Sequence, residues 1–194
     1  MTDRAERLAG YRHRRDHFFA AHPRSPLTES QRAGFSGLDY FPERADLALN
    51  LTLVESGSDV GESVDLPTTD GKQKSFTCAG RIRFEVEGEP VELTVLRDTD
   101  RGSLFVPFRD ASAGQETYGL GRYLEPQGRP DGTLEVDFNY AYNPFCAYRE
   151  GWSCPIPPEE NRLSVTIAAG EKRFSDPGEE PTGSAGLSGQ FLIS

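Results

Sequence analysis

The sequence predicts a mainly β fold, in which an antiparallel barrel-like or sandwich core carries an N-terminal α-helix packed on it. Three observations support this prediction. A charged segment with an apolar stripe at helical spacing comes first, apolar and polar residues alternate from about Leu47 onward, and tight-turn signals separate the alternating segments. Barrels and sandwiches produce the same alternation, so the pattern does not decide between them.

The N-terminal helix is expected over residues 3–21, where charged side chains surround an apolar stripe. The stripe consists of Leu8, Tyr11, Phe18 and Phe19. Pro23 and Pro26 follow, and the helix ends before them because proline cannot continue a helix. A short second helix is expected to begin at Thr28, a residue type that caps helix N-termini, and to stop at Gly34 and Gly37.

The clearest strand covers residues 76–86. Its buried face is expected to consist of Phe76, Cys78, Gly80, Ile82, Phe84 and Val86, with a bend at Gly80. A turn signal at residues 87–90 precedes renewed alternation at Val91, Leu93 and Val95, which predicts a β-hairpin. Further strands are expected at residues 104–108, 134–140 and 163–167.

Three segments follow from this pattern. Residues 1–34 form the helical segment, residues 35–174 the antiparallel β core, and residues 175–194 a tail rich in glycine, proline and acidic residues. Within the tail, Phe191, Leu192 and Ile193 could add a last edge strand.

Composition excludes several classes of function. The formal net charge of -10 repels nucleic acid and anionic lipid, so we expect neither as a partner. The sequence has no apolar run of about 18 residues and no apolar stretch after the N-terminus, so we expect no membrane span, no secretory signal and a cytoplasmic protein. It also lacks a phosphate-binding loop, a Gly-x-Ser-x-Gly elbow and a His-Glu-x-x-His motif.

The most distinctive segment covers residues 137–161, which combine tyrosines, asparagines, prolines and two cysteines. Asp137 and Asn139 fall out of phase with the apolar face of their strand, so they face either solvent or a polar barrel interior. Asp137 together with Glu116 or Glu160 could form a general acid–base pair. Asn139 and Asn143 flank Tyr142, although asparagines in turns usually bond their own backbone.

Cys146 and Cys154 allow several interpretations. For a cytoplasmic protein we favour thiols that pack the loop, ahead of a local disulfide or redox pair and of a metal site. His13 and His17 share a helical face and could complete a tetrahedral zinc site with the two cysteines. Both histidines lie among charged residues, so a solvated helix face is the favoured interpretation and we expect no metal. Cys78 is expected in the core.

A second group of polar residues combines Arg109 and Arg122 with nearby acids and tyrosines. The two guanidinium groups could clamp an anion between Tyr118 and Tyr123 as walls. Alternatively, Asp110, Glu116 or Asp137 neutralises the arginines in a structural ion-pair network, and the sequence favours this alternative.

These groups carry a resemblance to a known family. The resembling segments include Glu116-Thr117-Tyr118-Gly119, Gly121-Arg122-Tyr123-Leu124, Tyr142-Asn143-Pro144, Cys146-Ala147-Tyr148, Asn161 and Ala169-Gly170-Glu171-Lys172, with Arg15-Asp16 and Ser25-Pro26-Leu27 near the N-terminus. Over residues 11–174 the chain resembles the bacterial and archaeal family called domain of unknown function 1684. Because this family has no assigned activity, the resemblance identifies a family and leaves the function open.

The resulting hypothesis is a protein that binds a small anionic metabolite in a polar and aromatic pocket. The expected ligand-binding residues are Arg109, Glu116, Tyr118, Arg122, Tyr123, Asp137, Asn139, Tyr142 and Asn143. The alternatives are a hydrolase or lyase that uses Asp137 with Glu116 or Glu160, a redox protein that uses Cys146 and Cys154, and a structural or partner-binding protein. The sequence leaves both the cofactor and the oligomeric state open.

Overall fold

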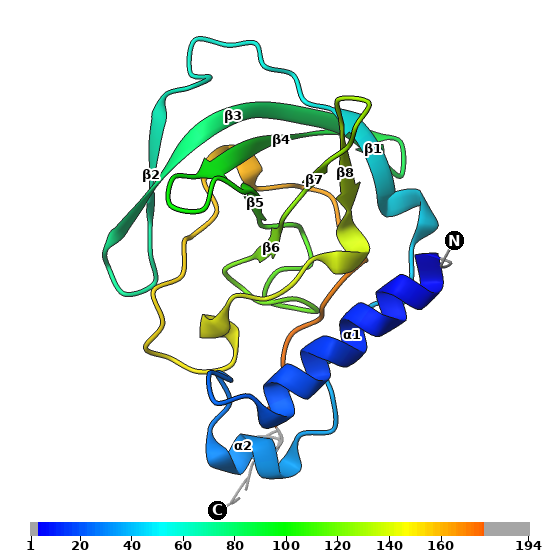
Figure 1. Ribbon diagram of the computed structural model, residues 1–194, viewed down its shortest axis with the longest axis vertical. Helices are drawn as coiled ribbons and strands as arrows, with labels where there is room; N and C mark the ends of the chain where they lie inside the picture. The colour runs from blue at the N-terminus through cyan, green and yellow to red at the C-terminus, as the bar shows by residue number, and fades with distance from the viewer. Residues whose placement is uncertain (1–3, 177–194) are drawn as a thin grey trace, which may run out of the picture.

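Two antiparallel sheets form the body of the protein in the computed structural model, which describes residues 4–176 (Figure 1). The larger sheet has the order β2-β3-β4-β5-β6 and curves into a half-barrel, and the smaller has the order β1-β8-β7. The strands are β1 Ala48–Thr52, β2 Ser63–Pro67, β3 Gln73–Val86, β4 Glu89–Asp98, β5 Leu104–Phe108, β6 Arg122–Leu124, β7 Gln127–Gly128 and β8 Thr133–Asp137. The predicted mainly β fold is confirmed, with a half-barrel as its larger sheet.

The β3–β4 hairpin follows the predicted alternation. Phe76, Cys78 and Ile82 are buried, and the register between the strands shifts between Cys78 and Gly80. Gly80 has a φ of 139°, and a Cβ at this position would lie 2.6 Å from the Val54 carbonyl oxygen. Only glycine therefore allows the chain beyond β1 to approach β3 this closely.

The two sheets are joined at this bend. Val54 and Arg81 exchange backbone hydrogen bonds of 2.8 and 3.0 Å, which link the chain after β1 to the middle of β3. Between the sheets lies the main apolar cluster, which includes Ile82, Leu93, Val106, Phe108, Val136 and Phe138. The free Cys78 is buried, as expected.

The N-terminal helix α1, Arg4–Ala21, lies diagonally across one end of the β body, next to the end of β8 (Figure 1). The second helix α2, Glu29–Gly34, begins after Thr28, whose hydroxyl accepts a hydrogen bond from the Gln31 backbone while the Gln31 side chain accepts one from the Thr28 backbone. This reciprocal cap confirms the predicted start. Phe19 on α1 packs with Leu27, Leu38 and Tyr148 in a separate apolar cluster.

Two predicted strands differ from the structure. β8 ends at Asp137, whose side chain caps the 3-10 helix η2, Phe138–Tyr140. Residues 163–167 are irregular, although Ile167 is buried in the main cluster as the alternation requires. Instead of pairing with a strand along its length, this segment bonds partly to buried side chains: the Ile167 N–H donates to Asp110, and its carbonyl accepts from Arg122. Short-range periodicity identified the buried face and could not identify the hydrogen-bond partners.

Three further 3-10 helices complete the fold: η1 Ala45–Leu47, η3 Phe145–Ala147 and η4 Glu159–Asn161. Among residues 4–176, no helix has the length and apolar character needed to cross a bilayer. The edge strand expected at residues 191–193 lies outside the described residues.

Candidate functional site

A pocket of about 280 Å³ lies where α1 meets the ends of β6 and β8. Its lining consists of Tyr11, Leu124, Glu125, Gln127, Glu135, Asp137, Tyr140 and Tyr142. Three carboxylates and three phenols therefore face one small space. Two of these residues, Asp137 and Tyr142, were predicted as site residues from the sequence.

Strand pairing explains the acidic wall. Glu135 and Asp137 lie two residues apart on β8, so their side chains point to the same side of the sheet. Leu134 and Val136, on the opposite side, are buried in the main apolar cluster. The out-of-phase position of Asp137 thus turns it toward the pocket.

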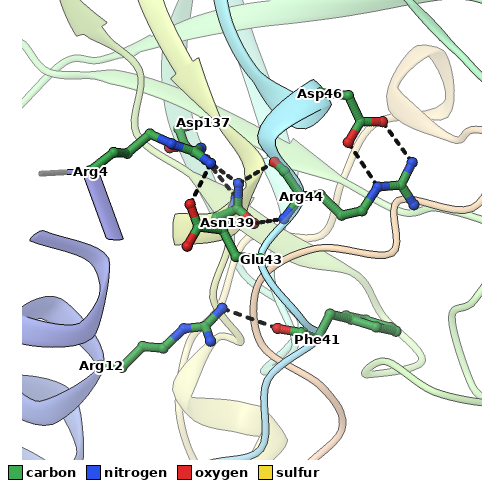
Figure 2. A network of polar contacts seen from close by, with 8 residues as sticks. All are labelled: Arg4, Arg12, Phe41, Glu43, Arg44, Asp46, Asp137 and Asn139. Carbon is green, nitrogen blue, oxygen red and sulfur yellow. Dashed lines mark hydrogen bonds and ion pairs between the residues drawn. The ribbon is translucent and has the colours of Figure 1, made fainter. Parts of the chain in front are cut away.

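A network of polar contacts fixes Asp137 in this wall (Figure 2). Its carboxylate accepts hydrogen bonds from the backbone N–H and the side-chain amide of Asn139, at 2.9 and 2.7 Å, and pairs with Arg4 at 3.4 Å. Asn139 is fully buried and bonds both the N–H and the carbonyl of Arg44, each at 2.8 Å. Asn139 therefore positions Asp137 and joins it to the chain before β1, and it does not line the pocket.

The aromatic wall comes from α1 and from the segment after β8. The rings of Tyr11 and Tyr140 meet edge to face with their centroids 4.9 Å apart, and the Tyr11 hydroxyl donates to the Tyr140 carbonyl at 3.2 Å. Burial raises the pKa of Tyr11 to about 12 and that of Tyr142 well above its ordinary value. Both phenols are therefore protonated at neutral pH. The Tyr142 hydroxyl donates to Glu125 at 2.6 Å.

A smaller pocket of about 130 Å³ shares Glu125 and Tyr142 with the first. Its remaining lining residues are Lys74, Phe76, Asp98, Arg101, Ser103, Phe105, Tyr123 and Pro155. Successive ring contacts join Phe76 to Phe105, Phe105 to Tyr123 and Tyr123 to Tyr142, with centroids 4.8 to 5.8 Å apart. The site thus has two chambers, and the Glu125–Tyr142 pair lies between them.

A buried charge network lies behind the larger chamber. Glu171 is 1% exposed and accepts hydrogen bonds from Arg15 at 2.8 Å and from the Asn143 side chain at 3.1 Å. Burial raises the pKa of Glu171, and the positive charge of Arg15 offsets part of that rise. The guanidinium carbon of Arg15 lies 5.2 Å from the centroid of the Tyr142 ring. Asn143 and Arg15 therefore connect α1 to the β body behind the pocket.

The structure places the side chains of the two arginines of the expected anion clamp in different environments. Arg122 is 0% exposed; its guanidinium donates to the carbonyls of Ile167, Ala169 and Glu171 and pairs with Asp110 at 3.4 Å. Arg109 is exposed. Since Arg122 offers no open face to a ligand, the structural network with Asp110 replaces the two-arginine clamp.

The other predicted residues are distributed over different parts of the molecule. Tyr118 donates to the Cys146 carbonyl at 3.5 Å, and Glu116 is exposed and pairs with Lys172 at 3.5 Å. Glu160 is exposed in η4. Neither Glu116 nor Glu160 lines the pocket that holds Asp137, and among residues 4–176 neither bonds to it. An acid–base pair of Asp137 with either glutamate is therefore not assembled.

Cys146 and Cys154 form a disulfide, with their Cα atoms 6.5 Å apart. This pairing corrects the preference for two packing thiols, which rested on the expected cellular location. The zinc site with His13 and His17 is not formed, because the cysteines bond each other and both histidines are exposed on α1. In the described part of the chain, no group of three or more histidine, cysteine or acidic residues could hold a metal ion.

Sequence reasoning missed Tyr11, Glu125, Glu135 and Tyr140 as pocket residues. Glu135 could have been found, because it shares the period-two face of Asp137. Tyr11 appeared only as part of the apolar stripe of a helix, and no local signal shows that this helix closes one end of the half-barrel.

Comparisons with known proteins agree with this fold. A family model described as "Protein of unknown function (DUF1684)" matches residues 33–172. The solution NMR structure of an uncharacterised protein from Haloarcula marismortui is similar, with 38% sequence identity and a TM-score of 0.65 over 87% of this chain and 93% of that one. No curated protein matches the sequence.

Proposed function

Since the chain belongs to the DUF1684 family, whose function is unknown, we propose a function from its own pocket: it binds a small cationic amine between α1 and β8. The observation that carries this proposal is the lining of the larger chamber, where three carboxylates and three tyrosines occur without a lysine or arginine. The proposal keeps the small-molecule partner expected from the sequence and reverses the expected sign of its charge.

Glu125 is the carboxylate best placed to meet an amine. Asp137 pairs with Arg4 at 3.4 Å, and Glu135 pairs with Arg129 at 3.3 Å. In the described part of the chain, Glu125 has no cationic partner and accepts its hydrogen bond from Tyr142. An ammonium group beside Glu125 would supply the missing positive charge.

The tyrosines favour the same class of ligand. The faces of aromatic rings attract cations, and sites that combine rings with carboxylates recognise ammonium and quaternary ammonium groups. Tyr11, Tyr140 and Tyr142 surround the space next to the three acids. The chamber lies near the lower end of the usual volume range for ligand sites, about 300 to 1,000 Å³, which favours a small molecule.

The test compares head groups on matched small molecules. Cadaverine and choline are titrated into the protein by calorimetry beside 1,5-pentanediol and pentanoate, which have related chains without the positive charge. We expect the cations to bind and the neutral and anionic probes to bind at least about tenfold more weakly, since a hydrogen bond to a charged group contributes roughly 1.5–3 kcal/mol.

Glu125→Gln removes the charge and keeps the shape, so it should lower the affinity for the cations by about tenfold. Glu89→Gln, at an exposed position beside the turn of the β3–β4 hairpin, is the matched control and should leave binding unchanged. Tighter binding of pentanoate than of cadaverine would return the ligand to the anionic class. Equal affinities of the wild type and Glu125→Gln for cadaverine would exclude Glu125 as its partner.

A further inference from the structure

We propose a second ligand site near the C-terminal end of α1, which binds a planar aromatic molecule carrying a carboxylate or phosphate. A pocket of about 570 Å³ lies there, and its lining includes Phe18, Arg24, Phe145, Arg149 and Trp152. It shares no lining residue with either chamber of the amine site. Its aromatic and cationic lining differs from the acidic lining of the larger chamber of that site.

Three aromatic side chains form one wall of this pocket. The rings of Phe145 and Trp152 meet edge to face with centroids 4.9 Å apart, and Phe18 lies nearly parallel to Phe145 with centroids 6.3 Å apart. These rings come from α1, from η3 and from the loop that follows it. A flat aromatic ligand can stack on or against such a wall, and ring pairs stabilise binding beyond the buried area alone.

Two arginines supply positive charge at this pocket. Arg24 and Arg149 are both exposed, and within residues 4–176 neither side chain forms a hydrogen bond or an ion pair. No acidic residue lines the pocket, although the chain carries a net charge of -10. Guanidinium groups bind carboxylate and phosphate oxygens through two parallel hydrogen bonds, so an anionic group on the ligand fits this end of the pocket.

Trp152 adds an unsatisfied donor. Its indole nitrogen is shielded from solvent and has no hydrogen-bond partner in the described part of the chain. An indole nitrogen can only donate, and a buried donor without an acceptor destabilises the protein. Because this nitrogen is shielded from the pocket as well as from bulk solvent, the two arginines are the groups that meet the anion, and the ring of Trp152 contributes to the aromatic wall.

The loop that carries two of these residues is fixed in place. Arg149 and Trp152 lie inside the ring closed by the Cys146–Cys154 disulfide, and the Trp152 carbonyl accepts a hydrogen bond from Thr69 at 2.7 Å. A loop held in its binding conformation loses less entropy when the ligand binds. The disulfide therefore contributes to this site by holding its lining in position.

The fluorescence of Trp152 provides a specific readout, because Trp152 is the only tryptophan in the chain. The intact protein is titrated with adenosine monophosphate and phenylacetate, each beside its uncharged counterpart, adenosine and phenylacetamide. At least one anion should change the emission saturably, and its uncharged counterpart should bind at least tenfold more weakly. A response to the nucleotide alone indicates a phosphate ligand, and a response to phenylacetate alone indicates a carboxylate ligand.

Arg149→Gln should weaken binding of the responding anion by at least tenfold, and Arg24→Gln should weaken it as well. Arg14→Gln, an exposed position on α1 outside the pocket, is the matched control and should bind like the wild type. The proposal is overturned if neither anion is preferred to its uncharged counterpart, or if Arg149→Gln binds as well as Arg14→Gln. Calorimetry with cadaverine tests the amine site separately, so failure at one site is distinguishable from failure at the other.

Discussion

Replacement of Arg122 by methionine should destabilise the protein strongly, because the guanidinium of Arg122 holds an irregular buried segment in place. Arg122 is 0% exposed and donates to the carbonyls of Ile167, Ala169 and Glu171, and it pairs with the buried carboxylate of Asp110. The segment around Ile167 forms no strand and depends on these contacts. Methionine fills a similar volume and satisfies none of the four acceptors.

The expected loss of stability follows from the carboxylate of Asp110, which would stay buried without its cationic partner. Removing one partner of a buried ion pair costs about 3–5 kcal/mol, because the remaining charge is uncompensated. The ordinary free energy of unfolding of a domain is about 5–15 kcal/mol, so Arg122→Met should remove a large share of it. For a domain of this size, the loss corresponds to a melting temperature lowered by roughly 6–20 °C, at about 2–4 °C per kcal/mol.

Urea denaturation followed by circular dichroism measures the change in the free energy of unfolding. Arg109→Met is the matched control: Arg109 is exposed, and its replacement should change stability by less than about 0.5 kcal/mol. Adding Asp110→Asn to Arg122→Met removes the orphaned charge, so the double variant should recover about 1 kcal/mol or more. The reasoning is refuted if Arg122→Met lies within about 1 kcal/mol of the wild type, or if Arg109→Met costs as much.

Two further predictions concern pH and the disulfide. Burial raises the pKa of Tyr11 from 10.0 to about 12, so the folded protein favours the protonated phenol. The contribution of this phenol to the free energy of unfolding is fully present below pH 10 and is lost as the pH rises toward 12. Across that range the melting temperature of the wild type should fall more steeply than that of Tyr11→Phe, and parallel curves would contradict the assignment. Replacing both Cys146 and Cys154 by serine removes a link across eight residues of sequence and should cost about 2–3 kcal/mol, or roughly 4–12 °C in melting temperature. An unchanged melting temperature in the double variant would show that the link does not constrain the unfolded chain.

Local patterns determined the elements that depend on local physics. The span of α1, the capped start of α2 and the β3–β4 hairpin with its bend at Gly80 could be predicted, because helical spacing, capping and alternation act over a few residues. The predicted strand at residues 163–167 was wrong, since its hydrogen bonds depend on Arg122 and Asp110, about 40 to 60 residues earlier in the chain.

In the candidate site, too, some residues could be predicted from local sequence and others depended on contacts between distant segments. The sequence identified Asp137 from its position out of phase with an apolar strand, and Tyr142 from a segment rich in tyrosine and asparagine. It also grouped Arg109 with Arg122, because both lie among nearby acids and tyrosines in the chain. Tertiary packing buried Arg122, joined Cys146 to Cys154 and placed Tyr11 of α1 beside Tyr140 and the acids of β8. By itself, the sequence determined the mainly β class and the buried face of its elements, because periodicity is local. Only the tertiary structure decided which charges face a common space, because that depends on how distant segments pack.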